Sequence, residues 1–273
     1  MKKIIIAISI FAVLFIVGCA SSTAATKDSY AVLLGLNPEE AAILTDYDTV
    51  VIDAQYFTKD EIAAVQAHGT TVLSYLNIGS IETFREGYDA LKDVILAPYD
   101  NWPEEYWVDV SKTEWQSFIA EEAQALIDKG ADGFFLDNAD VYYLYPTPAI
   151  YDGLTAILLN HEQYEKPILI NGGDVFVTKA VLDAEVPLSA ITGVNQECVF
   201  TNIDFGTGAL IRQDAENTRY YQDYLARCKA AGLDVYLLEY APKSSSIEKE
   251  IRSYCETNEY QFYLSHTINL DGK

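Results

Sequence analysis

The chain has 273 residues, of which 41 are acidic and 18 basic, which gives a formal net charge of −23, and half of its residues are hydrophobic. This length allows one large domain with a sizeable core, and the acidity argues against nucleic acid as a partner. With four cysteines in 273 residues, the chain does not belong to the disulfide-rich class.

The first predicted element is a secretory signal over residues 1–18. Lys2 and Lys3 precede an apolar run that is too short to span a bilayer comfortably. The run ends in Ile16-Val17-Gly18-Cys19, which resembles a bacterial lipobox, so we expect a lipidated Cys19 followed by a polar tether to residue 29. An ordinary cleaved signal and a membrane anchor are the alternatives. We therefore expect an exported bacterial lipoprotein, held by its acyl chains on the outer side of a membrane of the cell envelope.

Residues 30–273 contain eight short apolar runs and no internal linker. Continuous apolar runs are typical of strands in a parallel sheet that is covered on both faces. The number of runs and the length predict a single (β/α)8 barrel. The expected strands are Tyr30–Gly35, Thr49–Ala54, Thr71–Ile78, Gly133–Asn138, Ile168–Gly172, Ile191–Glu197, Asp234–Tyr240 and Gln261–His266.

Helices are expected between these strands. The stretches Thr58–Glu61, Ser111–Glu114 and Ser245–Glu248 all have the spacing of a capping box. The segment Ile81–Trp107, after the third strand, is too long for an ordinary connection between strand and helix. Long insertions on the carboxyl face of a barrel usually shape a binding cleft.

Polar residues occupy the carboxyl ends of the predicted strands, where barrel enzymes carry their active sites. Because side chains alternate along a strand, only about half of these residues are expected to face the mouth, and the sequence does not fix which half. Most clusters of Asp and Asn are local turn caps, so the prediction of an active site depends on their recurrence. The strand-end residues are Asp53, Tyr75, Asn77, Asp137, Asn138, Asp140, Asn171, Glu197, Glu239, Tyr240 and His266.

Asp137 and Glu197 end the fourth and the sixth predicted strand, which places two carboxyl groups across one narrow mouth. Glycoside hydrolysis requires such a pair, because one acid protonates the leaving oxygen while the other attacks the sugar or activates water. The separation of the two groups decides between a covalent intermediate and direct water attack, and the sequence leaves it open. If Glu197 is the acid, we expect its pKa to be raised.

Several motifs occur in an order that resembles glycoside hydrolase family 114, the endo-α-1,4-polygalactosaminidase-like barrels. They are Tyr75-Leu76-Asn77-Ile78-Gly79-Ser80-Ile81-Glu82-Thr83-Phe84-Arg85, Asn101-Trp102-Pro103-Glu104-Glu105-Tyr106-Trp107-Val108-Asp109-Val110, the Asp132–Asp140 segment, and Asn195-Gln196-Glu197. The resemblance covers nearly the whole mature chain. It implies a barrel that hydrolyses a partly deacetylated, cationic polymer of α-1,4-linked galactosamine.

The resemblance also implies roles for single residues. Asp137 would be the nucleophile or the charge-stabilising carboxylate, and Glu197 the general acid/base. The sugar subsites would be lined by Asp53, Tyr75, Asn138, Asp140, Asn171 and Tyr240. Glu82 and Arg85 are expected to form an ion pair that holds the long loop, with direct contact to the sugar as the alternative. Trp102 and Trp107 are expected to anchor this loop rather than to stack on sugar.

Two other classes of protein remain possible at this stage. One is a surface carbohydrate-binding lipoprotein without turnover, and the other is a solute-binding lipoprotein of a transporter, which would need two smaller α/β domains. We expect no metal or organic cofactor, because the chain has no HExxH motif, CxxC motif or phosphate-binding glycine loop. We also expect a monomer. Cys228 and Cys255 fall on neighbouring predicted helices, where a disulfide and two free thiols are both possible.

Overall fold

The computed structural model describes residues 28–185 and 187–273. The predicted signal peptide and Cys19 lie outside the described residues. Within residues 28–185 and 187–273, no helix has both the length and the apolar character needed to cross a bilayer.

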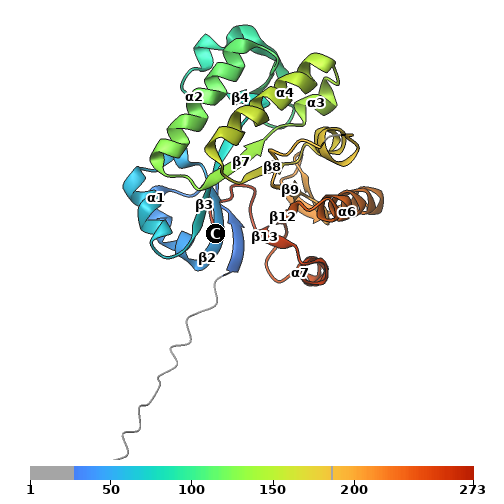
Figure 1. Ribbon diagram of the computed structural model, residues 1–273. Helices are drawn as coiled ribbons and strands as arrows, with labels where there is room; N and C mark the ends of the chain where they lie inside the picture. Colours follow the sequence, from blue (N-terminus) through green and yellow to red (C-terminus); the bar gives the residue numbers. More distant parts are fainter. Residues whose placement is uncertain (1–27, 186) are drawn as a thin grey trace, which may run out of the picture.

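Eight parallel strands form one sheet that curves into a nearly closed barrel (Figure 1). Their order around the barrel is the order of the sequence, which is the topology of a (β/α)8 barrel and confirms the predicted fold class. The solute-binding alternative, with its two domains, is therefore wrong. The strands are β1 (Asp28–Val32), β2 (Tyr47–Ile52), β3 (Thr71–Asn77), β7 (Gly133–Asp137), β8 (Ile168–Asn171), β9 (Gly193–Glu197), β12 (Asp234–Tyr240) and β13 (Gln261–Ser265).

Helices cover the outer face of the barrel (Figure 1). The longer ones pack an apolar side against the strands, and the first connection is a 3-10 helix instead of an α-helix. The α-helices are α1 (Lys59–Gln66), α2 (Thr113–Lys129), α3 (Val141–Leu144), α4 (Pro148–His161), α5 (Asp174–Val177), α6 (Ala215–Ala230) and α7 (Ser246–Asn258). The 3-10 helices are η1 (Pro38–Asp46), η2 (Ala54–Tyr56), η3 (Tyr88–Ala90), η4 (Lys92–Val94) and η5 (Glu162–Tyr164), and η6 (Thr178–Leu182) is π-helical.

Of the three predicted capping boxes, the one at α1 is confirmed. Thr58 and Glu61 exchange the two reciprocal hydrogen bonds there. The prediction at α2 was wrong, because Ser111 bonds to Asp109 instead and the helix begins after Lys112. At α7, Ser245 holds the N-cap position but its hydroxyl makes no capping bond. Residue type and spacing thus predicted where the three helices begin. Whether the capping hydrogen bonds form depends on the other hydrogen-bond partners near each helix start.

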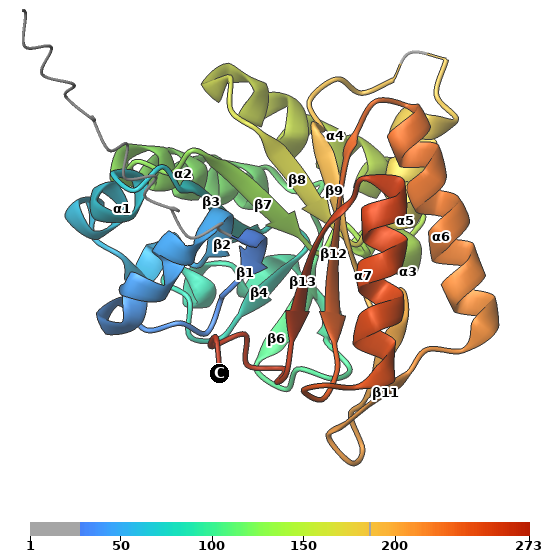
Figure 2. The ribbon, with the colours of Figure 1, turned by 90° about the horizontal axis from the view of Figure 1, so that it is seen from below.

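The predicted long insertion folds into a small antiparallel sheet. Its strands are β4 (Ser80–Glu82), β5 (Ile95–Pro98) and β6 (Glu105–Val108), with β6 in the centre. A second small sheet, the hairpin β10 (Thr201–Asp204) and β11 (Ala209–Arg212), follows β9 and was not predicted. Figure 2 shows the arrows of β12 and β13 pointing toward the end of the barrel where β6 and β11 lie. Both additions therefore stand at the carboxyl end.

The barrel has two apolar layers. Between strands and helices lies the larger core. A smaller cluster fills the barrel interior and includes Tyr30, Leu73, Phe135, Leu169 and Leu238. Two positions after Leu73, Phe135, Leu169 and Leu238 stand residues that point into the mouth, since side chains alternate between the two faces of a strand. The interior layer therefore fixes which polar residues at the strand ends face the cleft.

Candidate active site

A cleft of about 890 Å³ opens at the carboxyl end of the barrel. All eight residues that the sequence analysis assigned to catalysis or to sugar subsites line it: Asp53, Tyr75, Asp137, Asn138, Asp140, Asn171, Glu197 and Tyr240. The lining also contains Glu82, Glu104 and Glu105, and its only basic residue among the described ones is Arg85. The cleft therefore combines seven carboxyl groups with one guanidinium.

Three strand-end residues have other surroundings. Glu239 points to the outer side of β12, where it is fully buried and accepts hydrogen bonds from the backbone of Phe200 and Thr201. The side chain of Asn77 fixes the turn into β4 by accepting from the Ser80 amide. A ring nitrogen of His266 lies 2.8 Å from the Ala241 carbonyl oxygen. None of the three lines the cleft.

Asp137 and Glu197 are joined by one amide group. Asn171 Nδ2 lies 2.8 Å from Asp137 Oδ1 and 2.7 Å from Glu197 Oε1, and it donates a hydrogen bond to each. These two facing oxygens can therefore be no more than about 5.5 Å apart, so the two carboxyl groups are near neighbours on the same cleft. Asn171, predicted as a subsite residue, thus contacts both members of the carboxylate pair.

The two carboxyl groups differ in their remaining contacts. Glu197 Oε2 accepts a hydrogen bond from the Tyr240 hydroxyl at 2.7 Å, so both of its oxygens have partners. Asp137 Oδ1 also accepts from the Asn138 amide, whereas Oδ2 has no hydrogen-bond partner among the described residues. Asp137 therefore presents one bare oxygen at the floor of the cleft.

Removal from bulk water raises the pKa of both carboxyl groups. The negative charge of Glu197 raises the pKa of Asp137 further, to well above its ordinary value, although the bond from Asn171 acts in the opposite direction. The bonds from Asn171 and Tyr240 lower the pKa of Glu197 but do not cancel the effect of burial. Like charges this close to each other disfavour the doubly ionised form of the pair. The expected upward direction of the Glu197 pKa is confirmed, and the pKa of Asp137 is raised as well.

The backbone turns sharply after each of these carboxyl groups. Asn138 follows Asp137 with φ 68°, and Cys198 follows Glu197 with φ 57°. Residues other than glycine rarely adopt this left-handed conformation, and where they do they cluster at functional sites. The two strands therefore end in the same way, one residue beyond each acid.

Asp140 lies on the loop after β7. Its Oδ2 accepts a hydrogen bond from the Gly173 amide at 3.0 Å, which ties this loop to the one after β8. Burial, followed by the charge of Asp174, raises its pKa to about 6. Gly172, with φ 62°, leaves room for this carboxylate, because a Cβ there would lie 2.7 Å from Asp140 Oδ2.

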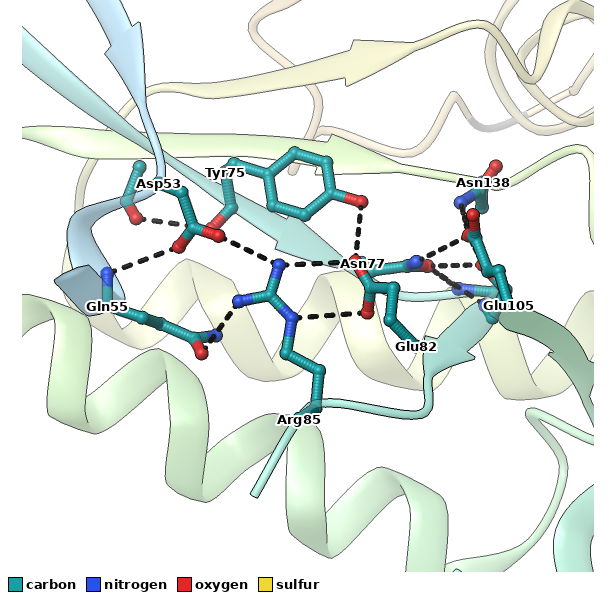
Figure 3. A network of polar contacts seen from close by, with 11 residues as sticks. Asp53, Gln55, Tyr75, Asn77, Glu82, Arg85, Glu105 and Asn138 are labelled. Atoms are coloured by element: carbon teal, nitrogen blue, oxygen red, sulfur yellow. Dashed lines mark hydrogen bonds and ion pairs between the residues drawn. The ribbon is translucent and has the colours of Figure 1, made fainter. Parts of the chain in front are cut away.

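Arg85 is surrounded by carboxylates at one side of the cleft (Figure 3). Its guanidinium lies 2.8 Å from Asp53 Oδ2 and 3.1 Å from Glu82 Oε1, and it donates to the side chain of Gln55. Tyr75 donates its hydroxyl to Glu82. The predicted ion pair of Glu82 and Arg85 is therefore confirmed, and it includes Asp53 as a third member.

Glu105, like Glu104, is an acidic residue of the cleft that was not predicted from the sequence. Its Oε1 accepts hydrogen bonds from the side chains of Asn77, Ser80 and Asn138 (Figure 3). Burial raises its pKa. The residue lies within one of the motifs quoted for the family resemblance. It stands on the inserted strand β6, and not at the end of a barrel strand.

The two tryptophans of the insertion have different surroundings. Trp107 is 7% exposed and stacks on Tyr99 at a centroid distance of 4.2 Å, which confirms its role as an anchor. For Trp102 that prediction was wrong. It is 43% exposed, lines the cleft, and forms a T-shaped ring pair with Phe205 from the β10–β11 hairpin at a centroid distance of 6.0 Å. An aromatic platform thus stands at the rim of the cleft.

Cys198, Cys228 and Cys255 are free thiols. Of the two alternatives for Cys228 and Cys255, the structure therefore shows the unbridged one, with both side chains buried. Among the residues that the structure describes, no three His, Cys, Asp or Glu side chains are grouped so that they could hold a metal ion.

The fold agrees with that of solved carbohydrate-active enzymes. The glycoside hydrolase domain of PelA from Pseudomonas aeruginosa superposes with a TM-score of 0.77 at 20% identity, over 89% of this chain and 96% of that one. Aspergillus fumigatus Ega3, in complex with galactosamine, gives 0.66 at 20% identity over 90% and 92%. The α-galactosidase TtGalA from Thermus thermophilus gives 0.58 at 10% identity over 88% and 58%. No curated protein sequence matches the chain significantly.

A barrel with two neighbouring carboxyl groups at its mouth fits one class of protein in particular, the glycosidases. The model of glycoside hydrolase family GH114 matches residues 18–168, which is more than half of the chain. The chain belongs to glycoside hydrolase family GH114, and the resemblance seen in its motifs is confirmed.

Proposed function

We propose that the protein hydrolyses a cationic polysaccharide of α-1,4-linked galactosamine by double displacement, with Asp137 and Glu197 as its catalytic pair. The observation that carries this proposal is the single amide of Asn171 that joins the two carboxyl groups across the cleft floor. Carboxyl groups that share one hydrogen-bond donor lie close together, and a close pair favours a covalent intermediate over direct attack by water.

In the first step, the bare Oδ2 of Asp137 attacks the anomeric carbon while the glycosidic C–O bond breaks. Glu197 donates its proton to the departing oxygen. In the second step, Glu197 takes a proton from water, the water oxygen attacks the same carbon, and the bond to Asp137 breaks. The carboxylate of Asp137 and the acid form of Glu197 are restored, and the product keeps the anomeric configuration of the substrate.

The charge of the cleft supports a cationic substrate. Seven carboxyl groups and one guanidinium line it, and a field of this sign attracts ammonium groups. The ammonium at carbon 2 of galactosamine is bonded next to the carbon that Asp137 attacks. Its charge would lower the pKa of Asp137 and leave the shared proton on Glu197, where the first step needs it. The structure of the similar Ega3 contains galactosamine.

The proposal also assigns the subsites. Asp53, Tyr75, Asn138 and Asp140 line the cleft and would contact the polymer. Asn171 and Tyr240 would act mainly through their hydrogen bonds to the carboxyl pair, in addition to any contact with sugar.

The test is the release of reducing ends from α-1,4-linked galactosamine oligomers by the chain without residues 1–19. Asp137→Asn and Glu197→Gln run beside it, with the fully N-acetylated oligomers as a second substrate. We expect activity in the parent, a loss of several orders of magnitude in both variants, and a preference for the cationic oligomer. Proton NMR of the first product should show retention. Inversion, or full activity in either variant, would contradict the mechanism, and equal rates on both oligomers would contradict the substrate.

We further propose that the protein is exported and held at a membrane by an acylated Cys19. The sequence of residues 1–19 supports this, with its lysines, its apolar run and the lipobox-like end at Cys19. In a bacterial host, the parent should fractionate with membranes and carry a lipid mass on its N-terminal peptide. Cys19→Ala should release the protein from the membrane fraction. A soluble parent with an unmodified cysteine would contradict the anchor.

A further inference from the structure

A chain of three side chains crosses the interior of the barrel beneath the carboxyl pair. The hydroxyl of Tyr30 on β1 donates to Asn195 Oδ1 on β9 at 3.1 Å. Asn195 Nδ2 donates to Asn171 Oδ1 on β8 at 2.7 Å. Asn171 then donates to both Asp137 and Glu197. The side chains of Tyr30, Asn195 and Asn171 are at most 5% exposed.

This chain of hydrogen bonds has a direction. A carboxamide group has one accepting end and one donating end, so a bond at one end determines what the other end offers. Tyr30 donates to Asn195 Oδ1, and the Nδ2 of Asn195 faces Asn171. Asn171 Oδ1 is thereby occupied, and its Nδ2 is turned toward the carboxyl pair. If Asn195 were reversed, its oxygen would face the oxygen of Asn171, and the two would repel each other.

We propose that Tyr30 and Asn195 are positioning residues that fix the amide of Asn171, so that it donates to both carboxyl groups. This inference rests on the proposed roles of Asp137 and Glu197. A reversed Asn171 would present its oxygen to the pair, which would disfavour the ionised forms of both acids. The protonation state of the pair would then depend on a hydroxyl group in the barrel interior that does not line the cleft.

Packing alone does not explain the hydroxyl of Tyr30. Its ring lies 4.7 Å from the ring of Tyr236 within the apolar interior layer, and phenylalanine would make the same ring contact. Asn195 Oδ1 is the only hydrogen-bond partner of this hydroxyl among the described residues. A fully buried amide in the same layer also requires partners at both ends. The hydrogen bonds of Tyr30 and Asn195 therefore act on the carboxyl pair rather than on the packing of the apolar interior.

Two variants test this relay of Tyr30, Asn195 and Asn171, and a third variant serves as a matched control. Tyr30→Phe removes the first donor. Asn195→Asp keeps the size of the side chain, and in its ionised form it offers oxygen alone, which turns the Nδ2 of Asn171 away from the pair. Tyr236→Phe removes a hydroxyl from the neighbouring ring and leaves the relay intact.

The first measurement follows the carboxyl carbons of Asp137 and Glu197 by NMR through a pH titration, which needs no substrate. We expect both variants to raise the pKa values of the pair, with the larger rise in Asn195→Asp and none in Tyr236→Phe. The second measurement is the pH dependence of kcat on the galactosamine oligomers. Tyr30→Phe should lower kcat about tenfold with KM nearly unchanged, the loss expected from one misplaced hydrogen bond. Asn195→Asp should lower it by at least a further factor of about ten.

The outcomes separate this inference from the proposed function. If Asp137→Asn and Glu197→Gln remain active, the catalytic assignment fails, whatever Tyr30→Phe does. If those two are inactive while Tyr30→Phe and Asn195→Asp titrate and turn over like the parent, the relay is wrong. Should one relay variant fail to fold, the other supplies the same two measurements.

Discussion

Tyr240 donates its hydroxyl to Glu197 Oε2 across 2.7 Å, from the strand next to the one that carries the acid. Each of the two residues stands at the last position of its strand, β12 for Tyr240 and β9 for Glu197. A donor that faces a carboxylate stabilises its ionised form, so this bond lowers the pKa of Glu197 against the effect of burial.

The first prediction concerns this bond. Tyr240→Phe removes the donor and therefore raises the pKa of Glu197. A general acid works in its protonated form, so the high-pH limb of the kcat profile should move to higher pH, with kcat at its optimum lower by about tenfold. Tyr221→Phe is the control, because it removes a hydroxyl from the lining of the same cleft without touching Glu197. An unmoved high-pH limb in Tyr240→Phe would contradict Glu197 as the acid.

The second prediction concerns stability against pH. Burial raises the pKa of Glu239 to about 7, against the hydrogen bonds it accepts from Thr201 and the backbone. The folded state therefore holds a proton that the unfolded state releases near pH 4.5, and stability declines as the pH rises from about 4.5 to about 7. Between these two pH values, the parent should lose up to about 3 kcal/mol more unfolding free energy than Glu239→Gln does. Denaturant titrations at several pH values measure it, and parallel curves would show that Glu239 does not titrate.

The third prediction concerns Arg85. Arg85→Ala leaves Asp53 and Glu82 buried beside each other without their cation, and should lower the unfolding free energy by about 3–5 kcal/mol. Lys92→Ala removes an exposed pair with Asp89 on the same insertion and should change it little. Thermal unfolding of the two variants gives the comparison. Equal melting temperatures would mean that the Arg85 cluster serves the substrate rather than the fold.

The fourth prediction concerns the rim of the cleft. Trp102→Ala removes an exposed aromatic face, so KM for long oligomers should rise by about tenfold while kcat on the shortest cleaved oligomer stays near the parent value. Leu96→Ala is the control, since Leu96 is 40% exposed on the same insertion but does not line the cleft. Similar KM values for long and short oligomers in Trp102→Ala would argue against a sugar platform at this position.

Much of this molecule follows from its sequence, because parallel strands with two covered faces are continuous apolar runs that end in polar residues. Because these runs are apolar on both faces, they do not show which polar residue at a strand end points into the barrel mouth. Both faces of β12 are apolar, so nothing in its sequence distinguished the inward Tyr240 from the outward Glu239. Contacts across the barrel settle this, since Leu238 belongs to the interior layer and shares a face with Tyr240.

Residues on the additions to the barrel were harder to predict for a different reason. Glu105 reaches the cleft because β6 pairs with β4 over the mouth, and this pairing depends on contacts between distant residues. Gly79 is part of the same arrangement. A Cβ there would lie 1.8 Å from the carbonyl oxygen of Asn138, so the start of the insertion can pass close to the end of β7 only as glycine. The sequence showed a long insertion, but not where it would return to the barrel.

The barrel closes without a complete ladder. The ladders within the described part of the chain run from β1 around to β13, and none joins these two strands, although Gly35 donates to the Leu270 carbonyl near the mouth. Such a seam is the natural place for local opening below the global unfolding temperature. Because β1 carries Tyr30, opening at the seam would disconnect the relay from the carboxyl pair while the other strands remain folded. Heat should therefore inactivate this enzyme reversibly before it melts, and a stabiliser that bridges β1 and β13 would extend the working temperature more than one placed elsewhere.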